Sequence, residues 1–493
     1  MNNIPNVKIG LVAVSRDCFV IELSEKRRRA VMSACKGSNT SIEEISVTVE
    51  NEADVGAALK EIDELGVNAL VILLGNFGPE TPETMLAQKF DGPVMFVASA
   101  EESQDNLFDG RGDAYCGLLN ASYNIGIRKL LPYIPESPVR DAVGVAEEIE
   151  SFADIARAVI GVSKLKIISF GPRPNDFVAC NAPIKPLFDL GVELMEKSEL
   201  DLFVDFKEHE NDERIADVAA DMASELGSGN THPDMLDKLA QYELTLVDFY
   251  EQNKGLSEYV VFANKCWPAF EAQFGFVPCY VNSRLAGRGI PVACEADIYG
   301  ALSEYIAVCV TQKPPAFLDI NNTVPQDMYD DNAEIGKKYK PDDLFMGFHC
   351  GNVSSGCLNT PTLKHQLIMH RLMESDSEPN ITRGTLEGTI MAGDVTMFRL
   401  QSTADCELRS YIAQGEVLDI DPKSFGSIGV FAVSEMGRFY RHVLVEKRFP
   451  HHAAVAFGHT GKAMFEVIKM LGVTDIGFNQ PSGMMYETEN PYK

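Results

Sequence analysis

Short, largely apolar runs are the feature that most restricts the fold of this chain. They are expected to be strands, and in the N-terminal third they lie at Val7–Val14, Ala69–Leu74 and Pro93–Ala98, with a more polar candidate at Ser46–Val49. An apolar strand must be covered on both faces, which is typical of a parallel sheet flanked by helices. Stretches of helical composition separate these runs, at Ser24–Cys35, Glu52–Leu65 and Leu118–Leu131. The alternation predicts right-handed βαβ crossovers and a doubly wound sheet.

The same pattern starts again near residue 165. Further strands are expected at Leu165–Phe170, Tyr259–Ala263, Pro291–Ala293 and Ala316–Ile320, and helices at Ile215–Leu226, Met235–Asn253 and Asp297–Thr311. After about Pro341 the pattern changes to short β-prone pieces broken by Gly and Asp, at Gly388–Met391, Val395–Leu400 and Ile428–Phe431. Such spacing is typical of an antiparallel sheet or small barrel.

The predicted fold class is therefore α/β, with two Rossmann-like doubly wound domains followed by a β-rich C-terminal domain. The expected boundaries are 1–164 for the first α/β domain, 165–343 for the second and 344–493 for the β-rich domain. A length of 493 residues agrees with about three domains.

Composition excludes several classes of function. The formal net charge is −29 at pH 7, so the surface would repel a phosphate backbone, and nucleic acid is not expected as a partner. No apolar stretch reaches the roughly 18 residues that span a bilayer, and the N-terminus lacks the pattern of a signal peptide, so no membrane association is expected. Eleven scattered cysteines without CxxC pairs favour a reducing compartment, and we expect a cytoplasmic protein.

Two carboxylates fall where open α/β sheets place their ligands, at the carboxyl ends of strands. Glu295 follows the strand Pro291–Ala293, and Asp319 lies near the end of the strand Ala316–Ile320. A spacing of 24 residues fits one strand–helix–strand crossover, and successive parallel strands are frequently neighbours, so both side chains are expected in one cleft. The alternative is local: Glu295 as an acidic residue at a helix N-terminus and Asp319 as a turn residue.

A histidine cluster near the C-terminus adds a third kind of ligand. His451, His452 and His459 lie within nine residues, out of nine histidines in the chain. Two carboxylates and one neutral imidazole make an oxygen-rich site that suits Mn²⁺ or Mg²⁺. The other reading of a histidine here is an ordinary core or surface residue.

The segments that carry these residues resemble the L-fucose isomerase/L-arabinose isomerase superfamily. Pro291–Asp327 resembles the metal-site segment of that family, in which a glutamate after a strand and an aspartate 24 residues later ligate Mn²⁺. The C-terminal stretch HHAAVAFGHTG resembles its histidine segment, in which the third ligand lies seven residues before the histidine of a Gly-His pair. The family's two Rossmann-like domains and β-rich third domain also match the domain order predicted for this chain.

The resemblance implies a metal-dependent aldose–ketose isomerase, an intramolecular oxidoreductase. It implies Glu295, Asp319 and His452 as metal ligands, and Glu295 and Asp319 also as the groups that transfer protons. Mn²⁺ is the expected cofactor, with Mg²⁺ or Co²⁺ as substitutes. The expected substrate is an open-chain sugar such as L-fucose or D- or L-arabinose, isomerised through an enediolate.

Other residues enter through the same resemblance. Lys265 and Trp267 lie in a stretch that resembles a substrate-contacting segment, and Arg16 matches an arginine that reaches a neighbouring subunit's site. His349 is the candidate for an additional histidine at the metal, and His459 is expected to contact substrate. The resemblance also implies a homo-oligomer, with a hexamer favoured.

Departures from the family pattern leave the sugar open. An aromatic-glycine stretch before the histidine is replaced by Lys447-Arg448-Phe449-Pro450, and Trp267 is the one tryptophan of the chain. The alternative substrate is an anionic 6-substituted sugar resembling sulfoquinovose, which Arg16, Lys265 and the Lys447-Arg448 pair favour. Two further alternatives are a metal-dependent aldolase and a sugar-binding protein.

Overall fold

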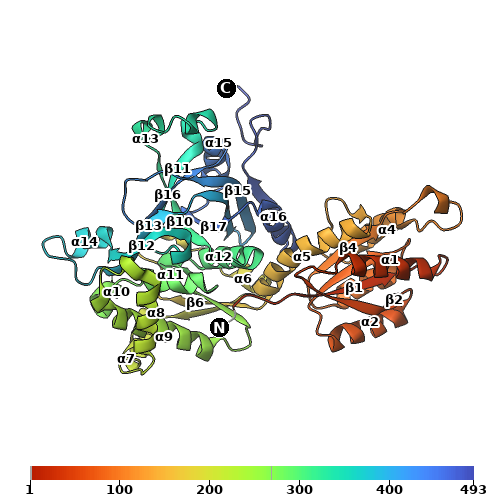
Figure 1. Ribbon diagram of the computed structural model, residues 1–493, viewed down its shortest axis with the longest axis horizontal. Helices are drawn as coiled ribbons and strands as arrows, with labels where there is room; N and C mark the ends of the chain where they lie inside the picture. The colour runs from red at the N-terminus through yellow and green to blue at the C-terminus, as the bar shows by residue number, and fades with distance from the viewer. Residues whose placement is uncertain (1–2, 268, 493) are drawn as a thin grey trace. The chain divides into compact units, whose positions relative to one another are not determined.

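The computed structural model describes residues 3–267 and 269–492, and it divides them into two compact units (Figure 1). The first unit comprises Pro5–Ile160 with Phe465–Gly472, and the second comprises Gly161–Met464 and Val473–Lys493 with the N-terminal segment Met1–Ile4. Among the described residues, no helix is long and apolar enough to cross a membrane.

The first unit contains a five-stranded parallel sheet in the order β2-β1-β3-β4-β5. Its strands are β1 (Lys8–Val14), β2 (Ser41–Val49), β3 (Ala69–Leu74), β4 (Val94–Ser99) and β5 (Val139–Arg140). Its helices are α1 (Ile21–Ala34), α2 (Glu52–Glu64), α3 (Glu80–Lys89), α4 (Ala114–Ile127) and α5 (Ala142–Ser163), the last of which runs three residues into the second unit. Every residue of β3 and β4 is buried, as the fully apolar runs predict.

The second unit begins with a four-stranded parallel sheet in the order β7-β6-β8-β9. The strands are β6 (Leu165–Phe170), β7 (Glu193–Lys197), β8 (Tyr259–Ala263) and β9 (Val292–Ala293). The helices are α6 (Lys185–Asp189), α7 (Glu199–Glu208), α8 (Ile215–Leu226), α9 (Leu236–Asn253), α10 (Phe270–Phe274), α11 (Cys279–Gly287) and α12 (Ile298–Thr311). All but the last residue of α12 are buried, so this helix is part of the core.

A nine-stranded sheet forms the rest of the second unit. Its strands are β10 (Ala316–Thr323), β11 (Leu344–His349), β12 (Leu358–His365), β13 (Arg383–Ile390), β14 (Gly393–Ser402), β15 (Leu408–Leu418), β16 (Ser427–Ala432), β17 (His452–Phe457) and β18 (Asp475–Phe478). The additional helices are α13 (Gln326–Asp330), α14 (Leu367–Met373), α15 (Met436–Phe439) and α16 (Gly461–Met470), which ends in the first unit.

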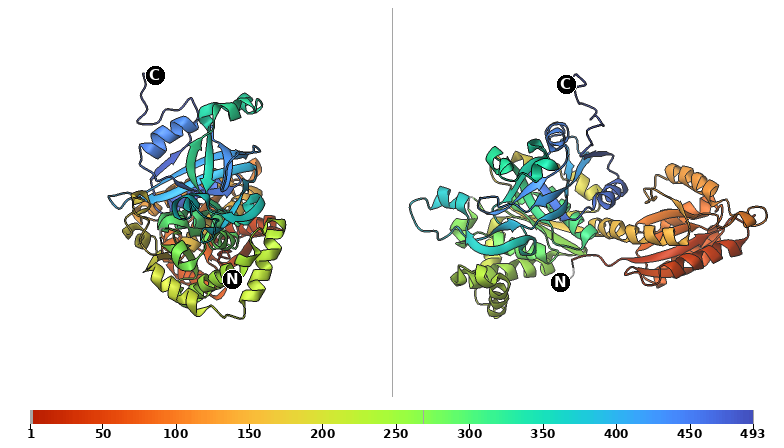
Figure 2. Two further views of the ribbon diagram at one scale, coloured as in Figure 1. Left: turned by 90° about the vertical axis from the view of Figure 1, so that its left-hand side faces the viewer. Right: turned by 45° about the horizontal axis from the view of Figure 1, so that its top comes forward.

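Six of these strands close into an antiparallel barrel. The pairings run β16-β11-β10-β17-β14-β15, and β15 pairs again with β16. Strands β12 and β13 extend the sheet beyond β16, and β18 adds to β15 in parallel. Figure 2 shows the same strands, in green to blue, from two further directions. The predicted fold class, two parallel α/β sheets and a β-rich C-terminal region, is confirmed.

One detail of the prediction is wrong. Ala316–Ile320 was expected to be a strand of the second α/β sheet, but β10 pairs antiparallel with β11 and β17 and belongs to the barrel. Asp319 is therefore a barrel residue, while Glu295 follows the parallel sheet. A short apolar strand does not reveal which partner it pairs with, because periodicity reports burial and not register. The boundaries proposed at 164/165 and 343/344 remain a prediction.

Candidate active site and metal centre

Barrel register brings Asp319 and His452 together. Strand β10 pairs with β17 so that Asp319 lies directly opposite His452. Directly opposed residues of antiparallel strands have Cβ atoms about 5 Å apart on the same face of the sheet. Phe317, two residues earlier on β10, packs its ring 4.6 Å from the His452 ring, centroid to centroid. Pairing of the two strands thus fixes a carboxylate and an imidazole side by side.

Glu295 enters from the other sheet on a turn with an unusual backbone. Glu295 and Ala296, directly after β9, have φ values of 60° and 56°, in the left-handed region that side chains other than glycine rarely adopt. The Ala296 amide donates to the carbonyl oxygen of Asn264 at 2.8 Å, which ties the turn to the end of β8. Strain of this kind persists where the surrounding structure fixes it and is frequent at functional sites.

The three side chains meet at the Nε2 atom of His452. This atom lies 3.3 Å from Glu295 Oε2 and 3.5 Å from Asp319 Oδ1. Within the described chain, neither His452 Nε2 nor Glu295 Oε2 has a hydrogen-bond partner, although both are buried. Buried polar atoms are seldom left unsatisfied.

The arrangement fits a divalent cation. Ligand atoms about 2.1 Å from an octahedrally bound ion lie roughly 3 Å apart, close to the separations at His452 Nε2. Carboxylate oxygens with one imidazole nitrogen suit Mn²⁺ or Mg²⁺. Glu295, Asp319 and His452 are therefore able to hold such an ion.

A buried network behind His452 sets its orientation. His452 Nδ1 donates to Asp297 Oδ2 at 2.8 Å, and Arg399 donates to both oxygens of Asp297 at 2.7 and 2.9 Å. All three side chains are at most 1 % exposed. With Nδ1 occupied as a donor, Nε2 is the nitrogen left to bind a metal, an arrangement that also raises ligand basicity.

Charges in the network shift the pKa values of its members. Burial would raise the pKa of Asp297, but the Arg399 guanidinium and the His452 hydrogen bond outweigh it and lower the pKa below the usual range. Burial would likewise raise the pKa of Glu295, but its contacts with His451 and His452 lower it to about 2. Burial would lower the pKa of His452, whereas the hydrogen bond to Asp297 and the proximity of Cys180 and Glu295 hold it well above its usual value.

Two further histidines lie at the cluster. His451 Nε2 is 3.6 Å from Glu295 Oε2 and 3.8 Å from Asp319 Oδ1, and its side chain is 37 % exposed. His349, on β11, has a ligand atom within 4.8 Å of those of Asp319 and His452. Burial lowers the pKa of His349, which favours its neutral, ligating form. The structure thus places His349 beside Asp319 and His452.

Lys265 and Trp267 lie near the site, and His459 lies apart from it. Lys265 Nζ donates to the Pro172 carbonyl oxygen at 2.8 Å and pairs with Glu199 at 3.2 Å. The Trp267 ring packs edge-on against Phe177, whose ring is 5.7 Å from that of His451. His459 Nε2 contacts the Gly415 carbonyl oxygen at 3.0 Å, and about half of its side chain is exposed.

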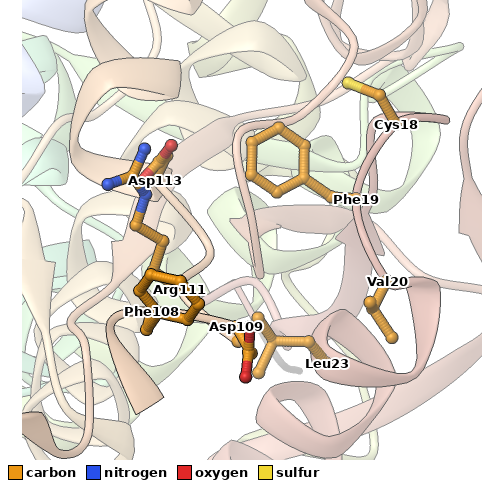
Figure 3. A pocket seen from close by; sticks show the side chains of 9 residues that line it. Cys18, Phe19, Val20, Leu23, Phe108, Asp109, Arg111 and Asp113 are labelled. Carbon is orange, nitrogen blue, oxygen red and sulfur yellow. The ribbon is translucent and has the colours of Figure 1, made fainter. Parts of the chain in front are cut away.

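Arg16 belongs to the first unit, at the carboxyl edge of the five-stranded sheet. Its guanidinium carbon lies 4.9 Å from the centroid of the Phe77 ring, which stacks on Phe19. A cavity of about 510 Å³ opens beside Phe19, between the segment after β1 and the segment that precedes α4. Figure 3 shows Cys18, Phe19 and Val20 on one side and Arg111 with Asp113 on the other. Arg111 pairs with Asp113 at 3.0 Å.

The sequence alone does not identify the residues that contact the three candidate ligands. Asp297 was treated as the start of a helix, which is also true, because it caps α12 by accepting from the Gly300 amide at 2.8 Å. Arg399 stands between the apolar Phe398 and Leu400 in β14, and this contrast is the one signal that the sequence offers. His451 was visible as the neighbour of His452, but alternation along a strand gave no reason to place both imidazoles at one site.

Two family models match parts of this chain on either side of Glu295 and Asp319. Residues 10–163 match the family model described as the N-terminal domain of fucose/sulfoquinovose isomerase, and residues 347–477 match the C-terminal domain of L-fucose isomerase. Proteins from Priestia aryabhattai and Priestia megaterium, both described as sulfoquinovose isomerase, are 23% identical over 475 residues, 95% of this chain and 98% of each relative. Another sulfoquinovose isomerase, from Clostridium sp. (strain MSTE9), is 29% identical over 301 residues, 59% of each chain.

Proposed function

Because this chain belongs to the fucose isomerase-like family and is a sugar isomerase, we propose that its substrate is sulfoquinovose. Sulfoquinovose is glucose with a sulfonate on C6, and the product would be the corresponding 2-ketose. The relatives favour this anionic sugar over L-fucose or arabinose, since each of those named carries the description sulfoquinovose isomerase.

One observation carries the proposed chemistry: Glu295, Asp319 and His452 converge on one point. Two of the converging atoms, Glu295 Oε2 and His452 Nε2, lack hydrogen-bond partners in the described chain. We propose these three residues as ligands of Mn²⁺, with Mg²⁺ or Co²⁺ as substitutes and His349 as an additional ligand. A bound divalent cation would chelate the oxygens on C1 and C2 and stabilise the negative charge that develops during isomerisation.

The two carboxylates also suit the proton transfers. Isomerisation removes the proton from C2 and delivers one to C1, and a positioned acid–base group contributes roughly 10²–10⁴-fold to the rate. We assign Glu295 as the base toward carbon and Asp319 as its partner. Asp297 and Arg399 hold the His452 ring, so that His452 ligates without taking part in proton transfer.

We further propose a homo-oligomer, with a hexamer as the favoured form, in the cytoplasm. The proposal rests on Arg16, because its family counterpart reaches a neighbouring subunit's site. Arg16 lies over the Phe77 ring at the edge of a sheet that contains none of the three proposed ligands. Light scattering at assay concentration checks the assembly, and an active monomer would exclude it.

A substrate panel tests the function directly. The purified protein with Mn²⁺ should convert sulfoquinovose to its ketose with a kcat/KM at least tenfold above that for L-fucose, D-arabinose or L-arabinose. Ketose formation is followed by NMR. Turnover of the neutral sugars alone would support the family's activity and reject the anionic substrate.

Deuterium tracing tests the route of the hydrogen. A base that exchanges its proton with water during the lifetime of an enediolate leaves solvent deuterium on C1 of the ketose when the reaction runs in D₂O. NMR of C1 at low conversion reads this directly. Complete transfer of a C2 label without solvent deuterium would favour a hydride shift and reduce Glu295 to a ligand.

A further inference from the structure

A cavity lies at the carboxyl edge of the four-stranded sheet, beside the ligand cluster. Its volume is about 560 Å³, within the range of small-molecule sites. All four strands contribute to its wall: Arg173 follows β6, Glu196 is on β7, Lys265 follows β8 and Ala296 follows β9. This edge is where open parallel sheets bind their ligands.

The cavity wall includes two residues that adjoin the ligand cluster. Ala296 in its wall is the residue after Glu295, and Cys180, also in its wall, has its Sγ atom 3.7 Å from His452 Nδ1. None of Glu295, Asp319 and His452 lines the cavity itself, so the Glu295–Ala296 turn is the boundary that the cluster and the cavity share. A sugar whose C1 and C2 oxygens lie at the cluster would pass Ala296 to place the group on C6 inside the cavity.

Two cations line the cavity, and they differ in what they already bind. Lys265 is buried, pairs with Glu199 at 3.2 Å and donates to the Pro172 carbonyl oxygen. Arg173 donates to the adjacent Pro174 carbonyl oxygen at 3.1 Å, and in the described chain no carboxylate oxygen lies within 4.0 Å of its guanidinium. Most of the five N–H donors of Arg173 thus remain available, while Lys265 holds the turn on which Arg173 stands.

We propose that Arg173 binds the anionic group on C6 of the substrate, so that this cavity is the sulfonate subsite. This inference rests on the proposed function. A guanidinium presents a planar fork of donors to the oxygens of a tetrahedral anion. Glu196 is the one carboxylate among the lining residues, and a sulfonate monoanion brings less negative charge near it than a phosphate dianion would.

The test compares Arg173→Gln with the wild type on three sugars: sulfoquinovose, glucose 6-phosphate and the neutral 6-deoxyglucose. The variant should raise KM for sulfoquinovose about 10²-fold, the loss of charge-assisted hydrogen bonds, and change kcat by less than about threefold. Activity on 6-deoxyglucose should stay within about twofold. Arg173→Lys should restore part of the affinity, since it keeps the charge and loses the fork.

Arg441→Gln is the matched control, because Arg441 is 61% exposed, pairs with Glu446 and does not line the cavity. It removes the same charge and should leave all three sugars unaffected. Glu196→Gln should act in the opposite direction and lower KM for sulfoquinovose about two- to fivefold by removing a nearby negative charge. Calorimetric titration of sulfoquinovose into the metal-free wild type and metal-free Arg173→Gln compares their affinities without turnover.

The outcomes separate the two proposals. Wild-type enzyme that isomerises neutral sugars but not sulfoquinovose would reject the proposed substrate. Wild-type enzyme that prefers sulfoquinovose, with an Arg173→Gln variant of unchanged KM and unchanged calorimetric affinity, would reject the subsite alone. A wild-type preference for glucose 6-phosphate that depends on Arg173 would reject sulfonate in favour of phosphate.

Discussion

The two parallel sheets of this protein present different chemistry at equivalent edges. At the edge of the first sheet, the cavity beside Phe19 has apolar side chains on one part of its wall and Asp109, Arg111 and Asp113 on another, and Arg111 is already paired with Asp113. At the edge of the second sheet, a strained turn exposes Glu295 to a histidine and a second carboxylate. The same sheet architecture thus carries different chemistry, and strand-end turns and neighbouring elements decide the difference.

Removing a ligand at the second edge should have the largest effect. Glu295→Gln, Asp319→Asn and His452→Ala should each lose bound Mn²⁺ and reduce kcat/KM about 10³-fold or more, because each removes a donor from a small ligand set. Metal content by mass spectrometry and steady-state kinetics measure both effects.

Asp113→Asn, at the first edge, is the matched control and should keep full metal content. The ligand assignment is wrong if His452→Ala retains its metal while His349→Ala or His459→Ala loses it. Circular dichroism of each variant distinguishes loss of metal from loss of fold.

Weakening the buried network should have the next largest effect. Asp297→Asn leaves Arg399 buried without its carboxylate and keeps one acceptor oxygen of two, so that His452 and Arg399 compete for it. Loss of an outer-shell partner lowers metal affinity about 10–100-fold, and an uncompensated buried charge destabilises the fold by roughly 3–5 kcal/mol. Competition with a chelator measures the affinity, and thermal unfolding measures the stability. Metal affinity equal to that of the wild type would mean that Asp297 does not position His452.

In the first unit, a buried glutamate should make the free energy of unfolding depend on pH. Glu83, on α3, is buried, and in the described chain neither of its carboxyl oxygens has a hydrogen-bond partner. Burial, with a smaller contribution from Glu80, raises its pKa well above 4.5 in the folded protein. The unfolded state therefore releases this proton at lower pH, so stability falls as pH rises from about 4.5 toward the folded pKa.

Glu83→Gln should remove that fall, by about 1.4 kcal/mol for each unit of pKa difference between the folded and unfolded states. Denaturant unfolding at pH 5 and pH 8 measures it, with Glu52→Gln at an exposed position as the comparison. An identical pH dependence in wild type and Glu83→Gln would show that Glu83 is ionised in the folded state.

Replacing an exposed aromatic side chain at the edge of the first sheet should have the smallest effect on stability. Phe108, in the wall of the cavity beside Phe19, is 95 % exposed. Phe108→Ser should change the free energy of unfolding by no more than about 0.5 kcal/mol, as surface substitutions usually do. A destabilisation above about 2 kcal/mol would mean that the ring is buried by another part of the assembly.

The sequence by itself determined several of the strands, the fold class and the identity of the ligand candidates. Strand and helix periodicities are local properties, so Ala69–Leu74 and Leu165–Phe170 were predicted with the bounds of β3 and β6. Glu295, Asp319 and His452 were selected by resemblance of short segments. The edge strand β7 was not predicted, because its sequence ELMEK is largely polar and carries little burial signal.

Tertiary structure alone decided how these residues meet. Crossover topology suggested that Glu295 and Asp319 would follow neighbouring parallel strands, whereas Asp319 reaches the site from a barrel strand paired with His452. The network that holds His452 joins residues more than 100 positions apart, Asp297 and Arg399. Register between distant strands depends on the packing of the whole barrel core, and no local pattern in the chain encodes it.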